Sequence, residues 1–400
     1  MTRRVVVVGG GIVGLAVAHR LLEIEPRTAV TLVEKEQAVG LHQTGHNSGV
    51  VHTGLYYQPG SLKAQLCSTG RLALLSFCER RSIAFEVCGK LVVAVRASEL
   101  GRLRVLFERG LKNEVPGLRL LDAQGIRDIE PHVRGLQAIY APTASIVSFA
   151  AVAGALAEEV RERGELWVGT EVTSVASGSD GKVALQLRGD HAGRLTCDVA
   201  VVCAGLQSDR LASRSGADAG PRVIPFRGEY YRLRPAARSL VRGLVYPVPD
   251  PRYPFLGVHL TRTVSGEVLV GPNAFLALAR ERYERWSIDW RDLYDTLSWP
   301  GFARFARSNW RAGVREFQHT ASRRSFANEA RRYVPELSVD DLEPAAAGIR
   351  AQAMARDGSL VDDFVLSARG HVLDVRNAPS PAATASFAIA EYLCRQAGLG

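Results

Sequence analysis

The start of the chain constrains the fold more than any other stretch. Four β-branched residues, Val5 to Val8, lead directly into a Gly-x-Gly-x-x-Gly motif, and a helical pattern follows to Leu22. In such a motif the first glycine allows a tight turn, the second lets backbone approach a pyrophosphate, and the third lets the helix pack on the strand. The unpaired N–H groups of the helix N-terminus then face the phosphates. The pattern predicts a dinucleotide-binding unit, whose glycines are Gly9, Gly11 and Gly14.

A second predicted strand supports this interpretation. It spans residues 29–34 and ends in Glu34, twenty residues beyond Gly14. An acid at this distance is placed to bind a ribose 2′-OH. The alternative is a glycine-rich turn in an unrelated α/β protein, and these residues alone do not distinguish FAD from NAD.

Size and hydropathy set the class of protein. A chain of 400 residues exceeds what one hydrophobic core usually supports, so we expect two domains. The mean hydropathy of −0.01 is that of a soluble globular chain, and no apolar run reaches the roughly eighteen residues of a membrane span. The first strand begins too early for a signal peptide. We expect a cytoplasmic protein, or one held peripherally on the cytoplasmic face of the inner membrane.

The cysteine spacing and the net charge limit which metals and binding partners we expect. The six cysteines form no C-x-x-C pair, so we expect reduced core thiols and no metal site. The net charge of +9 comes almost wholly from arginine. A basic surface can attract anionic substrates, anionic lipid or nucleic acid, but the chain has no nucleic-acid-binding motif.

The segment after Glu34 is dense in polar side chains and glycine. Residues 43–57 are Gln-Thr-Gly-His-Asn-Ser-Gly-Val-Val-His-Thr-Gly-Leu-Tyr-Tyr. Such a stretch is too polar for a core, and it is typical of a loop whose backbone surrounds a flat polar ligand. A turn-rich surface loop is the alternative.

The middle of the chain has a strand-like pattern interrupted by proline and glycine. It predicts an antiparallel sheet in a second domain, inserted into the first because nucleotide-domain features resume near the C-terminus. The predicted strands are residues 226–233, 255–262 and 267–271. The fold class is therefore α/β (α+β), with a discontinuous Rossmann-type domain. We expect that domain at residues 1–80, 145–218 and 340–400, and the substrate domain at 81–144 and 219–339.

Residues 276–332 have a helical pattern and unusual content. Four of the five tryptophans lie here among many arginines, namely Trp286, Trp290, Trp299 and Trp310. Tryptophan and arginine together are typical of a helix in a membrane interface. They also suit ordinary helices whose aromatic side chains pack within the substrate domain, which is the interpretation we prefer.

The chain ends in a further helix. Residues 377–384 open it, with Ser380 as the expected cap and Pro381 in the first turn, and it runs to Cys394. Its N-terminus carries partial positive charge and could face an anion, such as the N1/C2=O edge of a reduced flavin.

Three segments resemble a known family. They are residues 42–57, residues 257–262 with 271–273, and residues 376–386, the last being Arg-Asn-Ala-Pro-Ser-Pro-Ala-Ala-Thr-Ala-Ser. The chain resembles the L-2-hydroxyglutarate dehydrogenase/oxidase family, within the FAD-dependent D-amino-acid oxidase-like oxidoreductases. The likeness is weakest at 276–332. It implies that the cofactor is FAD and that the substrate is a small dicarboxylate, L-2-hydroxyglutarate, which is oxidised to 2-oxoglutarate. The implied electron acceptor is a quinone or oxygen.

The resemblance also implies which residues hold FAD. The glycine motif would bind the pyrophosphate, Glu34 with Lys35 the adenosine end, and the last helix the flavin pyrimidine edge. The implied set is Gly9, Gly11, Gly14, Glu34, Lys35, Thr44, Gly45, His46, Asn47, Ser48, Gly49, Val172, Ala204, Gly205, Asn377, Ala378, Ser380, Ala382, Ala383 and Thr384.

Oxidation of a 2-hydroxy acid needs a hydride acceptor, a base for the hydroxyl and cations for the carboxylates. The flavin supplies the first. A histidine suits the second, because its ordinary pKa lies near 6.5. His259, on a predicted substrate-domain strand, is the first candidate and His52, in the polar loop, the second; either could instead be structural.

Arg350 is the main candidate for binding the substrate carboxylate. It lies just before the cofactor-contacting tail, and arginine can clamp a carboxylate through two parallel hydrogen bonds. A structural ion pair is the alternative. Further candidates for the distal carboxylate are Tyr57, Lys90 and one of Tyr230 and Tyr231, of which alternation allows only one to face inward; we select Tyr231.

Two other function classes remain open. The same fold could oxidise a primary or secondary amine, as glycine and sarcosine oxidases do. The chain could also be a non-catalytic FAD-binding scaffold.

Overall fold

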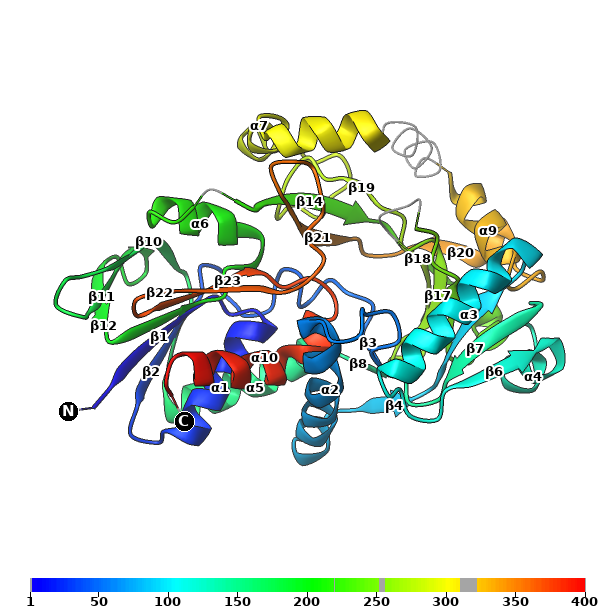
Figure 1. Ribbon diagram of the computed structural model, residues 1–400, viewed down its shortest axis with the longest axis horizontal. Helices are drawn as coiled ribbons and strands as arrows, with labels where there is room; N and C mark the ends of the chain where they lie inside the picture. Colours follow the sequence, from blue (N-terminus) through cyan, green and yellow to red (C-terminus); the bar gives the residue numbers. More distant parts are fainter. Residues whose placement is uncertain (1, 219, 252–255, 310–321, 400) are drawn as a thin grey trace.

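Two sheet-based halves lie side by side along the long axis of the molecule (Figure 1). The computed structural model describes residues 2–218, 220–251, 256–309 and 322–399. The half that contains both chain ends is the nucleotide-binding domain that the first sixteen residues predict.

A six-stranded sheet with β1 inside it forms the core of this half. Five strands are parallel and the edge strand β22 is antiparallel to its neighbour. In spatial order the strands are β22 (Val365–Arg369), β23 (Val372–Asn377), β13 (Val199–Val202), β1 (Arg4–Val8), β2 (Ala29–Val33) and β9 (Glu165–Trp167). All four valines of β1 are buried because both faces of the sheet are covered.

The two faces of this sheet have different covers. Val5 and Val7 pack against helices, whereas Val6 and Val8 pack against an antiparallel meander, as the alternation of side chains along a strand requires. The helices are α1 (Ile12–Ile24), α2 (Leu62–Arg80), α5 (Phe149–Arg163) and α10 (Ala382–Gln396). The meander is β10 (Thr170–Ser177), β11 (Val183–Gly189) and β12 (Gly193–Cys197).

The second half is built on an eight-stranded sheet, antiparallel except where β5 pairs with β16. In spatial order it contains β20 (Leu342–Pro344), β15 (Tyr231–Leu233), β18 (Val268–Gly271), β17 (His259–Arg262), β16 (Leu244–Pro247), β5 (Lys90–Ala94), β7 (Gln137–Ala141) and β6 (Arg119–Asp122). This arrangement confirms the predicted fold class.

Two small sheets and several helices complete the described structure. The sheets are β19 (Phe275–Leu276), β14 (Arg222–Gly228) and β21 (Gly348–Met354), and β3 (Val50–Val51), β8 (Ser145–Val147) and β4 (Phe85–Val87). The helices are α3 (Ala97–Lys112), α4 (Ala123–Ile129), α6 (Ser208–Arg214), α7 (Trp290–Leu297) and α9 (Arg323–Arg331), with 3-10 turns η1 (Gly205–Gln207), η2 (Pro235–Leu240) and η3 (Val339–Asp341).

The predicted domain boundaries stay a prediction, but strand pairing bears on one of them. β20 and β21 lie after residue 340, in the stretch we assigned to the nucleotide-binding domain. They pair with β15 and β14 of the substrate side. The return to the first sheet therefore comes at β22 and β23.

In the tryptophan-rich segment 276–332, some tryptophans pack within the protein and others are exposed, as a membrane-interface helix would have them. Trp299 is buried among Ile224, Phe226 and Met354, as packing predicts. Trp286 and Trp290 are exposed, so for them the preferred interpretation is wrong. The first position of the predicted strand 255–262 and the aromatic residues Trp310 and Phe317 lie outside the described residues. None of the described helices is both long and apolar enough to span a bilayer.

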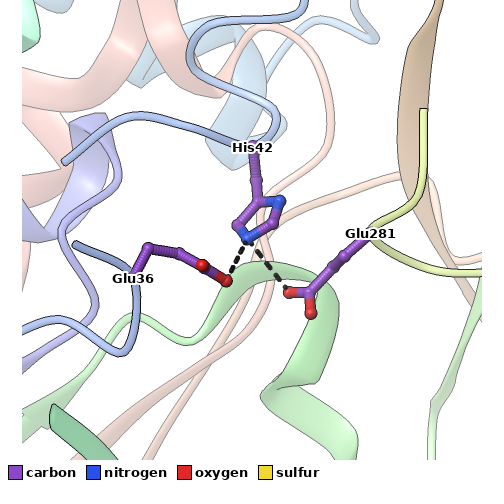
Figure 2. A group of neighbouring side chains, drawn as sticks. All are labelled: Glu36, His42 and Glu281. Carbon is purple, nitrogen blue, oxygen red and sulfur yellow. Dashed lines mark hydrogen bonds and ion pairs between the residues drawn. The ribbon is translucent and has the colours of Figure 1, made fainter. Parts of the chain in front are cut away.

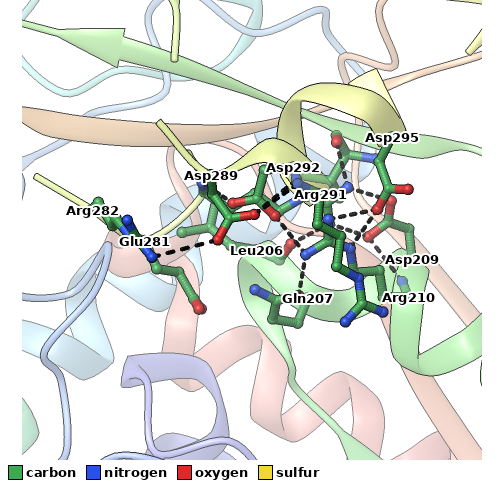
Figure 3. A network of polar contacts seen from close by, with 12 residues as sticks. Leu206, Gln207, Asp209, Arg210, Glu281, Arg282, Asp289, Arg291, Asp292 and Asp295 are labelled. Carbon is green, nitrogen blue, oxygen red and sulfur yellow. Dashed lines mark hydrogen bonds and ion pairs between the residues drawn. The ribbon is translucent and has the colours of Figure 1, made fainter. Parts of the chain in front are cut away.

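A buried ion pair joins the two halves. The fully buried guanidinium of Arg280 donates to both carboxylate oxygens of Asp209, at 2.5 and 2.9 Å, and to the carbonyls of Leu206 and Val223. Its backbone N–H donates to Asp292 of α7 at 2.6 Å. Figure 3 shows this region, where α6 and α7 face each other through aspartates and arginines.

We expect Arg280→Met to lower the free energy of unfolding by about 3–5 kcal/mol, because it leaves the Asp209 carboxylate buried without its cation. Arg234→Met is the matched control: Arg234 is half exposed and pairs with Glu343 at 3.4 Å, so its loss should cost under about 1 kcal/mol. Urea unfolding followed by circular dichroism measures both. Equal effects of the two substitutions would contradict the assignment.

Candidate active site and cofactor cavity

One continuous cavity runs between the two halves of the molecule. Its volume is 1240 Å³, and its wall extends from the glycine loop before α1, past the start of α10, to His259 on β17. Side chains from both ends of the chain and from the inserted sheet therefore face the same space.

The glycine motif shapes the inner end of the cavity. A Cβ on Gly14 would lie 2.0 Å from the carbonyl oxygen of Gly9, so only glycine lets α1 pack this closely on β1. Gly11 is different: a Cβ there would be in ordinary van der Waals contact with the Thr44 hydroxyl at 3.6 Å and would meet no heavy atom nearer than that. Gly11 is also the N-cap of α1 and offers no side chain to the first-turn N–H groups. This is a cradle for a phosphate.

Glu34 marks one end of the cradle. Its carboxylate accepts hydrogen bonds from the backbone N–H of Gly10 at 2.6 Å and of Glu36 at 2.8 Å. A carboxylate has about four acceptor sites, so this one is held in place with capacity left for ribose hydroxyls. Glu34 lines the cavity, as predicted.

An ion cluster closes the same end (Figure 2). Lys35 Nζ lies 2.6 Å from Glu36 and 2.8 Å from Glu281, and His42 Nε2 lies 3.0 and 3.6 Å from the same two carboxylates. Burial lowers the pKa of Lys35, but the two carboxylates more than offset it, and the net shift is upward. Two carboxylates and one histidine could hold a cation, but the Lys35 ammonium already lies between the carboxylates. The cluster joins the loop after β2 to the segment before α7.

The polar loop is folded by its own side chains. Thr44 Oγ1 accepts from the N–H of Ile12 at 3.0 Å, which ties the loop to α1. Asn47 donates to the carbonyls of Gln43 and Thr44 and accepts from Gly49 N–H. His46 Nδ1 donates to the Ala347 carbonyl at 3.0 Å, directly before β21. These bonds hold the loop in place, and most of residues 43–57 line the cavity, which favours the ligand-binding interpretation of this segment.

The start of α10 forms the opposite wall. Pro381, not Ser380, is the N-cap, which corrects the predicted cap. Ser380 instead lies 3.4 Å from His52 Nε2 and hydrogen-bonds with Tyr57. Thr384 Oγ1 accepts from the backbone N–H of His52 at 3.1 Å, so this helix and the polar loop hold each other.

The ring of His259 is held by a backbone carbonyl and buried beside the cavity. Its Nδ1 lies 2.9 Å from the Gly257 carbonyl, which can only accept, so Nδ1 carries the proton and Nε2 has a free lone pair. Burial lowers the pKa of His259 to about 3, with the Arg350 and Lys90 charges acting in the same direction and the bond to Gly257 opposing them. The imidazole is therefore neutral at physiological pH. Its ring stacks on Tyr246 at 4.0 Å between centroids.

His52 and Arg350 complete the chamber near His259. Burial, then the charges of Lys90, His259, Lys63 and Arg350, lower the pKa of His52 well below its usual value. Arg350 lies on β21 opposite Phe226 and hydrogen-bonds with Tyr230, whose pKa is raised by burial against the effect of the guanidinium. All three predicted catalytic residues line one cavity.

Two predicted substrate contacts lie elsewhere. Tyr231 does not line the cavity; it packs edge-on against Phe326 at 4.9 Å, and Tyr230 faces inward in its place. Lys90 is buried behind the cavity wall, with Nζ 4.1 Å from the Tyr246 ring centre and 5.4 Å from that of Tyr56. Burial lowers the pKa of Lys90 to about 8.

Tyr57 lines the cavity as predicted, and the sequence analysis missed three other residues of the cavity wall, Tyr56, Tyr246 and Lys63. Tyr56 lines the wall with a buried hydroxyl that has no partner among the described residues. Tyr246 stacks on His259. Lys63 Nζ pairs with Asp362 at 2.9 Å. Two of these had a usable signal: Tyr56 adjoins Tyr57 in the polar loop, and Lys63 is one of few lysines in an arginine-rich chain.

Nearly all of the residues expected to hold FAD line the cavity. Gly45 and Gly49 do not, because they serve the loop's own packing: a Cβ on Gly45 would lie 2.8 Å from Gly40 O, and one on Gly49 2.6 Å from Val147 O. The rest of the set therefore lines the cavity from the glycine motif on one side to Thr384 on the other.

The fold and this cavity define an FAD-dependent oxidoreductase. The FAD dependent oxidoreductase (DAO) family model matches residues 4–396. The L-α-glycerophosphate oxidase of Mycoplasma pneumoniae, solved with FAD bound, has the same fold, with a TM-score of 0.81 at 22% identity over 100% of this chain and 96% of that one.

Closer relatives identify the family within this class. L-2-hydroxyglutarate dehydrogenase from Nematostella vectensis is 43% identical, over 98% of this chain and 90% of its own. That from Indibacter alkaliphilus is 41% identical, over 99% of each chain. The protein belongs to the L-2-hydroxyglutarate dehydrogenase family.

FAD is the cofactor of this family, and the cavity fits it. The cradle at Gly11 would hold phosphate and the carboxylate of Glu34 would accept hydrogen bonds from ribose hydroxyls. The N-terminus of α10 faces the cavity from the other end, where its partial positive charge would favour an anion.

Two glycine substitutions separate folding from cofactor binding. Gly11→Ala should leave the FAD-free protein folded with an unchanged melting temperature but largely abolish bound FAD, because the methyl group occupies the phosphate cradle. Gly14→Ala should lower the melting temperature as well, because its Cβ collides with backbone. The flavin-to-protein absorbance ratio and thermal unfolding measure the two effects. Full FAD content in Gly11→Ala would contradict this placement.

Proposed function

We propose that the protein oxidises L-2-hydroxyglutarate to 2-oxoglutarate, with His259 as base and Arg350 as the clamp for the carboxylate next to the reacting carbon. The observation that supports this most is the chamber itself. A neutral histidine with a free Nε2 and an arginine face the same cavity that accepts FAD.

Each residue has a distinct task in this proposal. Bound FAD supplies the hydride acceptor for C2. His259 Nε2 removes the hydroxyl proton as C2–O becomes a carbonyl, and the bond from Nδ1 to Gly257 keeps the ring in the required tautomer. A dianionic substrate beside the imidazole raises its pKa from the low value of the empty chamber, so it becomes a better base when substrate binds.

The distal carboxylate is placed by the opposite wall. Tyr56, with its unpartnered buried hydroxyl, and Tyr57 are the donors, and Lys63 is a cation on the same wall. Lys90 acts through its charge from behind Tyr56 and Tyr246. His52 is positioned by Ser380 and Thr384 and is the second candidate for the base.

Electrons leave to a quinone or to oxygen, and we favour a membrane quinone. The protein would reach this acceptor by binding peripherally, on the cytoplasmic face of the inner membrane. The exposed tryptophans of the 276–332 segment support this choice over a purely cytoplasmic location.

Anaerobic reduction of the bound flavin tests the function. L-2-hydroxyglutarate should bleach the yellow holoprotein, whereas the D-enantiomer, glycine and sarcosine should not. Only the L-hydroxy acid can direct its C2 hydrogen to the flavin while its hydroxyl reaches the base and both carboxylates reach their binding residues. Absorbance near the flavin band follows the reaction. Bleaching by an amine alone would make the protein an amine oxidase, and no bleaching by any substrate would favour the scaffold alternative.

The same reduced protein then reports the acceptor. Mixing it with a soluble quinone analogue should restore the yellow colour much faster than mixing it with air-saturated buffer. Faster reoxidation by oxygen would overturn the choice of quinone and leave the substrate assignment unaffected.

His259→Ala should slow flavin reduction by about 10²–10⁴-fold while FAD content stays unchanged, because the imidazole contacts Gly257 and Tyr246 and supplies only the base. His132→Ala, which removes an exposed histidine from the same half of the molecule, is the control and should be silent. Stopped-flow absorbance gives the rates. An unchanged rate in His259→Ala would transfer the role to His52.

A further inference from the structure

The amphipathic helix α7 turns its apolar face to solvent and its acidic face to the rest of the protein. Trp290, Tyr294 and Leu297 lie on one face at i, i+4 and i+7, and their side chains are 75%, 71% and 56% exposed. The buried residues of α7 are Asp292 and Thr296. An ordinary surface helix buries its apolar stripe and exposes its charges.

Ion pairs fix this orientation. Asp292 and Asp295 receive the guanidinium of Arg210 at 2.7 and 2.5 Å, and Asp292 also accepts from the backbone N–H of Arg280 (Figure 3). Asp289 caps the helix N-terminus by accepting from Arg291 N–H and Asp292 N–H. The aspartates hold α7 against α6. The helix lies along one edge of the molecule (Figure 1), and its aromatic side chains are exposed to solvent.

The loop before α7 extends the same exposed surface. Trp286 and Ile288 are exposed, at 56% and 38%. Trp286 has φ of +69°, in the left-handed region that bulky residues rarely adopt. The Arg285 guanidinium lies 5.5 Å from its ring centre. Five of the large exposed apolar side chains of the described residues thus fall between positions 286 and 297.

The charges that accompany this surface are positive. Between residues 282 and 309, the exposed charged side chains are five arginines and one glutamate, namely Arg282, Arg285, Arg291, Arg304, Arg307 and Glu284. Arg282 pairs with Asp289 at 3.7 Å and Arg285 with Glu229 at 3.1 Å. Three of the arginines, Arg285, Arg304 and Arg307, are not part of the FAD cavity wall. Aromatic side chains with arginine suit the headgroup region of an anionic bilayer, which attracts the cations and accepts the rings.

We propose that the outward face of α7, with Trp286, Ile288 and the neighbouring arginines, docks on the surface of an anionic lipid bilayer. The proposal rests on the membrane-quinone acceptor proposed above and names the surface that reaches it. A second copy of the chain is a poorer occupant, because an isologous contact would bring the same arginines against one another.

Vesicle co-sedimentation of the FAD-loaded protein tests the proposal. The protein should bind vesicles that contain phosphatidylglycerol, bind much less to pure phosphatidylcholine, and be released by high salt. The triple variant Trp290→Gln, Tyr294→Gln, Leu297→Gln should bind about tenfold more weakly or less, since bilayer affinity scales with the apolar area inserted. None of these three residues lines the cavity, so flavin content and substrate bleaching should match the unmodified protein.

The matched control removes three exposed leucines from other surfaces, as Leu72→Gln, Leu111→Gln, Leu136→Gln, and should bind vesicles normally. Equal binding by control and α7 variants, or no binding by the unmodified protein, would overturn the docking surface while normal bleaching keeps the proposed function. Sedimentation equilibrium adds one more outcome. A dimer that the α7 variant converts to monomer, without vesicle binding, would assign the face to a second copy and also overturn the proposal.

Discussion

The contact between α1 and β1 at Gly14 is the constraint on which the rest of the structure depends. With a side chain there, the helix would move away from Gly9, and the first-turn N–H groups would no longer point into the cavity. The polar loop is tied to the same helix by the bond from Ile12 N–H to Thr44. The position of the polar loop, and of the cavity wall that it forms, therefore depends on the close approach of Gly14 to Gly9.

Burial sets the charge state of the residues around the chamber. Arg350 and Lys90 bring positive charge next to two histidines, and the same burial keeps those imidazoles neutral. In the proposed mechanism a neutral histidine accepts the proton, and the positive charge of Arg350 and Lys90 favours a dianion over an amine. Burial therefore contributes both to substrate choice and to the availability of the base.

Local signals were enough to predict the nucleotide site but not the substrate wall. Glycine spacing and an acid at the end of a strand act through backbone geometry, which sequence determines directly. The choice of Tyr231 over Tyr230 failed because residues 226–233 are not one strand: β14 ends at Gly228 and β15 begins at Tyr231, so alternation does not carry across the break. Lys90 opens a strand whose five residues are all buried, and whether its ammonium faces the cavity depends on the aromatic rings that intervene.

Helix α7 exposes its apolar side chains and buries acidic ones, which is the reverse of ordinary helix packing. Sequence composition could not decide which tryptophans are buried, because the answer depends on the partner surface. α6 presents Arg210, which selects the acidic face of α7. Replacing a buried ion pair with apolar packing is often neutral or stabilising, and burying one large apolar side chain contributes about 1.5–3 kcal/mol. Stability alone would therefore favour the helix with its aromatic face inward. A helix that keeps its ion pairs and exposes Trp290 and Tyr294 forgoes that gain, and the exposed face is then explained by an occupant that covers it when the protein is at work.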